Sequence, residues 1–277
     1  MSQPSLLPSE GEYLTTGWEP TVPPEDTLVR QAVLAHGDWV WAQGQAAGRP
    51  CRREAGWAAA YLSERASMSN MCVLLQPPAD LATVLAEVEE FYPPHVPALV
   101  LSPWPLGDLR SSGLAKVGHP PLMIHLPYPG LAAHPPPGSP PGVSIREART
   151  PADLATVERV LVEGFPLPDL SPPTAGELLP AGLLGGNTRA WLAEDGHRPL
   201  ACAVAYLGAG VILVQLVATL TDARRRGAGA GVTWAATLAD PARRAVLLAS
   251  DAGRPIYERM GYVAIERWSI WLRPGGA

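Results

Sequence analysis

The chain has 277 residues, of which 47% are hydrophobic, and its formal net charge is -5 at pH 7. This length can bury two cores of ordinary size, so we expect two domains. The acidic balance argues against a nucleic-acid partner. The sequence has no signal-peptide pattern and no run of about 18 apolar residues that would span a bilayer, so we expect a cytoplasmic protein with no membrane partner.

The cysteines and histidines show no pattern of a metal site. Cys51, Cys72 and Cys202 form no C-x-x-C pair, and we expect them to be reduced and buried. His119 and His125 flank an expected strand without a nearby cluster of carboxylates or thiols, and we assign them no chemistry. We therefore expect no bound metal.

The N-terminal half, residues 1–127, alternates between strand and helix patterns. Its expected elements are a strand at 71–75, a helix at 78–91, and strands at 98–102 and 121–126. A proline-rich segment, residues 128–142, follows; because proline lacks an amide hydrogen and restricts its neighbours, we interpret it as a semi-rigid linker.

A second domain is expected over residues 143–277. Thr150 and Pro151 suit the start of a helix, as N-cap and first-turn residues. The expected elements are a strand at 143–148, a helix at 150–163, a loop at 165–173, a short helical segment at 176–184, and strands at 189–193, 200–207 and 211–219.

A glycine-rich loop then leads from the last of these strands into a helical pattern. Gly227 and Gly229 carry no Cβ, so their amides can approach a phosphate oxygen closely, and the helix adds its positive dipole end. No Gly-Lys-Ser/Thr follows, as a P-loop would require. Asp240 lies too near for the acidic residue of a Rossmann fingerprint. The loop therefore favours a pyrophosphate-bearing cofactor of another kind.

A second pattern lies about 30 residues downstream. It combines an apolar strand at 245–249, a short helix that begins near Pro255 and ends before Gly261, and a strand at 267–272. Tyr257 lies on the short helix, and Tyr262 follows its terminal glycine.

These two segments together resemble the GNAT N-acetyltransferase superfamily. Arg224-x-x-Gly227-x-Gly229 is similar to its acyl-CoA motif, and residues 256–262 are similar to its aliphatic-Tyr-x-x-x-Gly-aromatic signature. A second frame through Arg226, Gly229 and Gly231 also fits the motif. The resemblance covers residues 143–272 in element order and is specific only over 217–262.

The resemblance implies an α/β (α+β) fold, with a mixed, mostly antiparallel central sheet flanked by helices. Residues 108–114 repeat the spacing of 256–262, so we expect two tandem GNAT-like domains, the first a degenerate copy. The alternative is that two ordinary α/β halves share common turns. The first copy has proline and Asp80 in place of the glycines, and Leu109 in place of Tyr257, so we expect it not to bind CoA.

The resemblance also implies acetyl-CoA as cosubstrate. Its pantetheine arm would pair with the strand at 217–219, where the Val217 amide would stabilise an oxyanion, and Tyr257 would be the general acid. The other interpretation of Tyr257 is an aromatic that only packs. The expected cofactor-binding residues are Val217, Ala218, Thr219, Arg224, Arg225, Arg226, Gly227, Ala228, Gly229, Ala230, Ser250 and Tyr257.

No general base is visible in the sequence. Gln215 lies on the strand before the motif, but an amide only orients a water or the substrate. Glu163, Asp169 and Asp251 are candidates that are equally compatible with solvated surface charges. A water relay or an amine that arrives deprotonated stays open.

Three functions remain in view. The first is acetyl transfer from acetyl-CoA to a small-molecule primary amine, with the acceptor between the two halves; the second is acetylation of a protein or peptide amine; the third is a non-catalytic acyl-CoA-binding regulatory module. A homodimer is a further expectation, because Trp268 and Trp271 on the final strand suit either a dimer face or the core.

Overall fold

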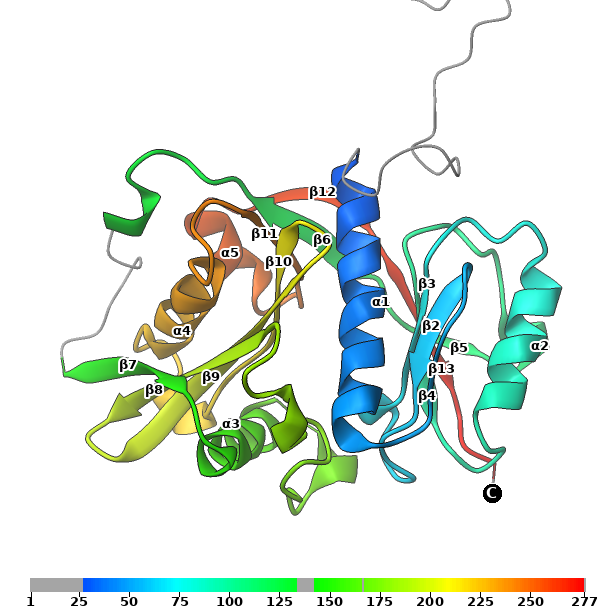
Figure 1. The fold of residues 1–277 in the computed structure, drawn as a ribbon, viewed down its shortest axis with the longest axis horizontal. Helices are drawn as coiled ribbons and strands as arrows, with labels where there is room; N and C mark the ends of the chain where they lie inside the picture. The colour runs from blue at the N-terminus through cyan, green and yellow to red at the C-terminus, as the bar shows by residue number, and fades with distance from the viewer. Residues whose placement is uncertain (1–26, 134–141, 166, 277) are drawn as a thin grey trace, which may run out of the picture.

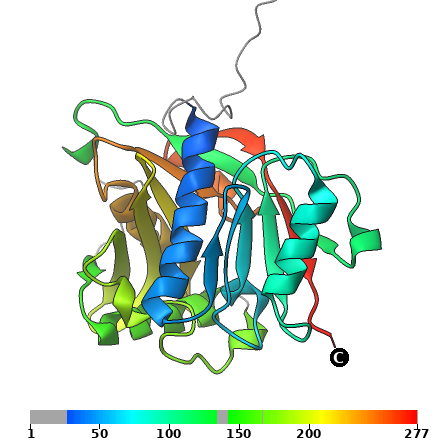
Figure 2. The same ribbon diagram turned by 45° about the vertical axis from the view of Figure 1, so that its right-hand side comes forward.

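The computed structural model describes residues 27–133, 142–165 and 167–276, which form two β-sheets with a long helix between them (Figure 1; Figure 2 shows the same arrangement turned). Most of the expected linker, residues 134–141, lies outside the described residues. The elements of the first half are α1 (Leu28–Ala47), β1 (Cys51–Arg53), β2 (Trp57–Ala60), η2 (Ser67–Ser69), β3 (Met71–Leu74), α2 (Leu81–Phe91), β4 (Ala98–Ser102), η3 (Arg110–Ser112), β5 (Ala115–Gly118), β6 (Pro121–His125) and η4 (Leu131–Ala133).

The second half contributes the remaining elements. They are β7 (Val143–Ala148), α3 (Pro151–Gly164), η5 (Pro168–Leu170), η6 (Ala181–Leu183), β8 (Thr188–Asp195), β9 (Arg198–Gly208), β10 (Val211–Thr219), η7 (Thr221–Ala223), α4 (Ala228–Thr237), β11 (Arg244–Leu248), α5 (Arg254–Arg259), β12 (Val263–Arg267) and β13 (Ser269–Arg273). Among the described residues, none of these helices is long and apolar enough to cross a membrane.

The two sheets exchange a strand. The six-stranded sheet has the order β1-β2-β3-β4-β13-β5, and the seven-stranded sheet has the order β12-β6-β11-β10-β9-β8-β7. Thus β6, from the first half of the chain, lies between β11 and β12, while β13, from the end of the chain, lies between β4 and β5. Neither half of the sequence completes its sheet alone, so a division at residues 128–142 does not separate the two sheets.

The two sheets repeat one pattern, as the expectation of a second copy requires. In the first, β2-β3 is antiparallel, β3-β4 parallel, and β13 antiparallel to both β4 and β5. In the second, β9-β10 is antiparallel, β10-β11 parallel, and β6 antiparallel to both β11 and β12. The connections correspond too, since α2 and α4 each join a parallel pair.

Two expected elements differ from the structure. Residues 176–184 form turns and the short η6 instead of a helical segment, because the carboxylate of Glu158 accepts hydrogen bonds from the amides of Gly176 (2.6 Å) and Leu178 (2.5 Å). The expected strand at 267–272 is divided at Trp268, where the chain passes from one sheet to the other.

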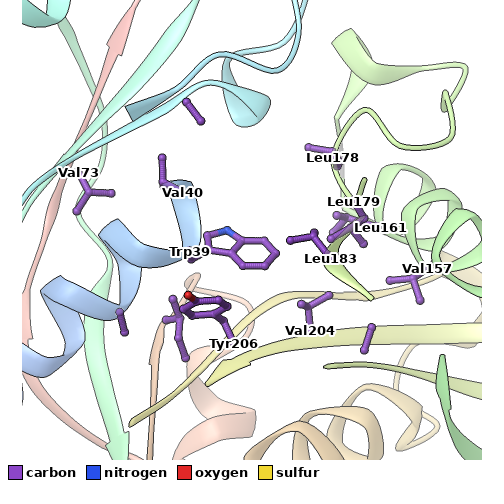
Figure 3. Packing of buried hydrophobic residues seen from close by; sticks show 14 of the residues in the cluster. Trp39, Val40, Val73, Val157, Leu161, Leu178, Leu179, Leu183, Val204 and Tyr206 are labelled. Atoms are coloured by element: carbon purple, nitrogen blue, oxygen red, sulfur yellow. The ribbon is translucent and has the colours of Figure 1, made fainter. Parts of the chain in front are cut away.

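Helix α1 was not expected from the sequence, because Gly37 and Gly44 weaken its pattern. These glycines lie seven residues apart on the face that approaches β1–β3, where a Cβ would overlap Leu75 and Cys51 respectively. On another face Trp39 contacts Tyr206 of β9, with ring centroids 5.7 Å apart (Figure 3). The helix therefore packs against both sheets.

His36 lies on the same helix and is only 6% exposed. Its Nδ1 is 2.8 Å from the carbonyl oxygen of Ala32, and its ring centroid is 4.6 Å from that of Trp268. Burial lowers the pKa of His36 to about 4. Trp268 and Trp271 are both buried within this chain, which supports the core interpretation for these two residues.

Replacing Leu122 of β6 by alanine tests the strand exchange. Leu122 is fully buried, so we expect the free energy of unfolding to fall by about 2–5 kcal/mol. Because each sheet contains a strand from the other half of the chain, urea unfolding followed by circular dichroism should remain a single shifted transition. Leu126→Ala is the control, since Leu126 is 59% exposed. Two separate transitions, with only one of them moved, would contradict the exchange.

The free energy of unfolding should depend on pH through the protonation of His36. The unfolded chain binds a proton below the ordinary pKa of 6.5, whereas the folded protein does not until about pH 4. The stability from neutral His36 is thus complete above pH 6.5 and is lost as the pH falls towards 4, by up to about 3 kcal/mol. In urea titrations between pH 7 and 4, the native protein should lose this stability and His36→Gln should not. If the free energies of unfolding of the two proteins fell in parallel with pH, the loss could not be assigned to His36.

Candidate functional site

Strands β10 and β11 separate partway along their length. They pair in parallel only from Val211 to Leu213 on β10, opposite Arg244 to Val246 on β11. On its other side, β10 has a bulge between Gln215 and Ala218, and the register with β9 passes over the residues between them. Leu216 there has φ 51°, a left-handed conformation that is rare outside glycine. The amide of Val217 consequently has no opposite residue in the strand ladder on either side.

The glycine-rich loop forms a helix N-terminus without a side-chain cap. Gly227 is the N-cap residue of α4, with φ 85°, and Arg225 two residues earlier has φ 61°. The first amides of α4 therefore point out of the helix without a side-chain acceptor, which suits an anion. Gly229 also meets a close neighbour, because a Cβ there would lie 2.5 Å from Thr219 Oγ1.

The arginines of the loop have different environments. Arg224 donates from Nη2 to the carbonyl oxygen of Gly164 at 2.8 Å, so it holds the loop against the end of α3. Arg226 lies 3.7 Å from Asp195, both partly exposed. Arg225 is exposed. The loop is thus fixed by Arg224, and Arg225 and Arg226 add positive charge at the surface.

The corresponding helix of the first sheet is capped by its own carboxylate. Asp80 Oδ1 accepts hydrogen bonds from the amides of Ala82 (3.0 Å) and Thr83 (3.3 Å) at the start of α2. The Thr83 hydroxyl and amide hold the pKa of Asp80 below its usual value. A negative charge already lies where a phosphate would bind, so this helix does not offer an anion site.

A cavity of about 590 Å³ opens where β10 and β11 separate. Val217, Ser250 and Tyr257 line it, together with Gln215 and Asp251. Val217, Ser250 and Tyr257 are thus brought together, although Val217 and Tyr257 are 40 positions apart in the sequence, whereas the other expected cofactor-binding residues, from Ala218 to Ala230, do not line this cavity.

Tyr257 is held in the wall of this cavity. It is 8% exposed, and burial raises its pKa to about 12. The edge of its ring lies against Gly253, where a Cβ would approach the Tyr257 hydroxyl to 3.1 Å. Tyr257 therefore remains protonated at neutral pH, as a hydrogen-bond donor must be.

The candidate bases expected from the sequence are separated by the structure. Asp251 lines the cavity, whereas Glu163 lies outside it and pairs with Arg159 at 3.7 Å. Asp169 is exposed on η5 and does not line the cavity. Of the expected loop at 165–173, Phe165 contributes to the wall of the cavity, and none of the described residues 167–173 does.

Two histidines in the cavity wall were not predicted from the sequence to be functional residues: His36 lies in a helix that was not expected, and His119 was assigned no chemistry. His36 comes from α1 and His119 from the connection between β5 and β6. No local motif marks either residue, because they reach the cavity only through the packing of α1 and the strand exchange. Within the described residues, no three histidine, cysteine, aspartate or glutamate side chains gather as a metal site would require.

Comparisons with known proteins identify the fold. No family model matches the chain, and no curated protein matches it. The solved structures that are similar to this chain include three proteins described as acetyltransferases. A GCN5-related N-acetyltransferase from Kribbella flavida has a TM-score of 0.60 at 21% identity, over 88% of this chain and 96% of that one.

Two further structures agree with the first. A putative GNAT-family acetyltransferase from Novosphingobium aromaticivorans has a TM-score of 0.53 at 16% identity, over 86% of this chain and 96% of that one. A GCN5-related N-acetyltransferase from Sphaerobacter thermophilus has a TM-score of 0.51 at 15% identity, over 88% and 94%. The chain therefore has the fold of the GNAT superfamily of N-acetyltransferases over most of its length.

Proposed function

We propose that the protein transfers an acetyl group from acetyl-CoA to the primary amine of a small molecule. The observation that carries this proposal is that the separation of β10 and β11, the bulge residue Val217 and Tyr257 meet at a single cavity. The uncapped N-terminus of α4 begins nine residues beyond the end of β10. A thioester with a pyrophosphate-bearing tail suits this combination of groups.

The cofactor-binding roles follow from the backbone. The amides from Arg225 to Ala230 would bind the pyrophosphate, since α4 supplies no competing carboxylate of the kind that Asp80 provides in α2. The free edge of β10 at 217–219 would pair with the pantetheine amides as an added strand does. Ser250, two residues after the end of β11, also lines the cavity.

The reaction divides between two groups of this chain. The Val217 amide would donate to the oxygen that becomes negative when an amine attacks the thioester carbonyl. Tyr257, protonated because its pKa is raised to about 12, would supply a proton or a hydrogen bond to the departing sulfur.

Charge at the start of α4 should control acetyl-CoA binding. Ala230 lies in the first turn of the helix, and a carboxylate introduced by Ala230→Glu would oppose the pyrophosphate. We expect calorimetry to show at least about tenfold weaker binding of acetyl-CoA. Ala242→Glu, on an exposed turn after α4, is the matched control and should bind as the native protein does. Equal affinities for the two variants would place the pyrophosphate elsewhere.

Removal of the Tyr257 hydroxyl should lower turnover rather than binding. For Tyr257→Phe we expect kcat for thiol release to fall by about 100-fold, with little change in the affinity for acetyl-CoA. Tyr262→Phe is the control, because its hydroxyl bonds Thr237 at 2.7 Å and does not line the cavity. An unchanged kcat in Tyr257→Phe would reduce Tyr257 to a packing residue.

A further inference from the structure

The two segments through which the chain crosses from one sheet to the other lie next to each other at the cavity. His119 and Pro120 connect β5 to β6, and Trp268 connects β12 to β13. The Trp268 amide donates to the carbonyl oxygen of Pro120 at 3.0 Å, and Arg267 Nη1 donates to that of His119 at 2.7 Å. His119 also precedes two prolines, which restrict its backbone to extended conformations. The position of His119 is therefore firmly fixed.

A hydrogen bond to the neighbouring crossing segment fixes the tautomer of His119. Its Nδ1 lies 2.8 Å from the carbonyl oxygen of Trp268, which only accepts, so Nδ1 carries the hydrogen. In the neutral ring Nε2 then has a free lone pair. The ring is exposed and lines the cavity, so a proton taken up by Nε2 can pass to solvent. These are the properties of a general base.

The register of β6 places His119 beside the chain that follows the C-terminal end of β11. The amide of Ala249 donates to the carbonyl oxygen of Pro121 at 3.0 Å, and β6 runs antiparallel to β11. His119, two residues before Pro121, therefore lies alongside the chain just after Ala249. Ser250 and Asp251 of that chain line the same cavity, as does Tyr257.

The other titratable groups of the cavity are poorer bases. They are His36, Asp251, Tyr257 and Arg267. His36 is buried with its pKa lowered to about 4, so it binds a proton weakly at neutral pH. Tyr257 and Arg267 are protonated there. Asp251 is the one carboxylate among the described lining residues, and carboxylates as a class are weaker bases than imidazoles.

Most of the remaining cavity wall is apolar. One side of it comes from the second half of the chain, through Leu161, Phe165, Val214, Leu216, Leu247 and Leu248, and another side comes from the first sheet and its flanking turn. Met68, Met71, Leu99, Leu101 and Val117 form this second side. The described lining residues include one carboxylate, Asp251, and one guanidinium, Arg267. A polycationic amine would find a single balancing charge, whereas an aryl or alkyl body would bury its surface against these side chains.

We propose that the first half of the chain forms the acceptor site, that the acceptor is a primary amine on a compact apolar body, and that His119 is its general base. The proposal rests on the proposed acetyl transfer. Nε2 of His119 takes one proton from the ammonium and releases it to solvent. The amine nitrogen then bonds to the carbonyl carbon as the carbon–sulfur bond breaks. The second nitrogen proton replaces the one that Tyr257 gives to sulfur, so the products are an amide, the free thiol and one proton.

His119→Asn tests the base. The asparagine amide can still donate to Trp268 at the Nδ1 position but has no basic nitrogen. With 2-phenylethylamine as acceptor, we expect kcat/KM at pH 7 to fall about 100-fold and acetyl-CoA affinity by calorimetry to be unchanged. The residual rate should rise about tenfold per pH unit as the amine itself deprotonates, and added imidazole should restore part of it. His95→Asn, at an exposed site outside the cavity, is the control.

Val117→Glu tests the acceptor class. Val117 is 54% exposed on the edge strand β5, so the substitution should not unfold the protein. We expect kcat/KM for 2-phenylethylamine to fall about tenfold, because a carboxylate enters the apolar wall. Val263→Glu adds the same charge on β12 outside the cavity and should have no effect. The native protein should acetylate 2-phenylethylamine faster than spermidine.

Three results would overturn the inference while leaving acetyl-CoA binding intact. They are activity of His119→Asn within threefold of the native protein with an unchanged pH profile, faster acetylation of spermidine than of 2-phenylethylamine, and acetylation of neither amine by native protein that binds acetyl-CoA. Failure of the native protein to bind acetyl-CoA would instead overturn the proposed function itself.

Discussion

The arrangement of this protein depends on the hydrogen bonding of two exchanged strands. In the second sheet β6 fills the place between β11 and β12, and in the first sheet β13 fills the equivalent place between β4 and β5. Without these strands β4 and β11 would present unpaired edges, which proteins avoid. The exchange joins the two sheets through backbone hydrogen bonds and sets the distance between them. The cavity lies where the chain crosses from one sheet to the other.

The two sheets share a topology but differ in the chemistry at the start of one helix. Asp80 supplies a fixed negative charge to the N-terminus of α2, whereas Gly227 leaves the N-terminus of α4 without one. The electrostatic consequence is opposite at the two sites, since the helix dipole is already satisfied in one and available to an anion in the other. One copy of the pattern is thus suited to hold a pyrophosphate, and the other to provide a wall.

Helix α1 packs between the two sheets and contacts both of them. Trp39 contacts Tyr206 of the second sheet (Figure 3). Gly37 allows the helix to approach the first sheet, because a Cβ there would overlap Leu75. Buried residues of both halves belong to one continuous core around this helix. A change that loosens α1 is therefore expected to alter the cavity, because His36 of the same helix lines it.

The sequence by itself determined the local elements of the second half and its glycine-rich loop. Strand β10 covers residues 211–219, as expected from the sequence, because an apolar run ends there before a glycine-rich turn. The expected GNAT-like order of the later elements depended on this assignment. The expected cofactor-binding residues and Tyr257 as general acid stay predictions. Residues 176–184 were wrongly expected to be helical, since the carboxylate of Glu158 that holds them lies about 20 positions away.

Only the tertiary structure decided the partners of β6 and β13, and with them which residues of the first half line the cavity. Strand pairing across more than 100 residues leaves no periodic signal in either segment, because the same apolar strand can fill either sheet. His119 shows the consequence. In the sequence it is an isolated histidine before two prolines, and it becomes a candidate base only where the exchange brings it to the wall that Tyr257 also lines.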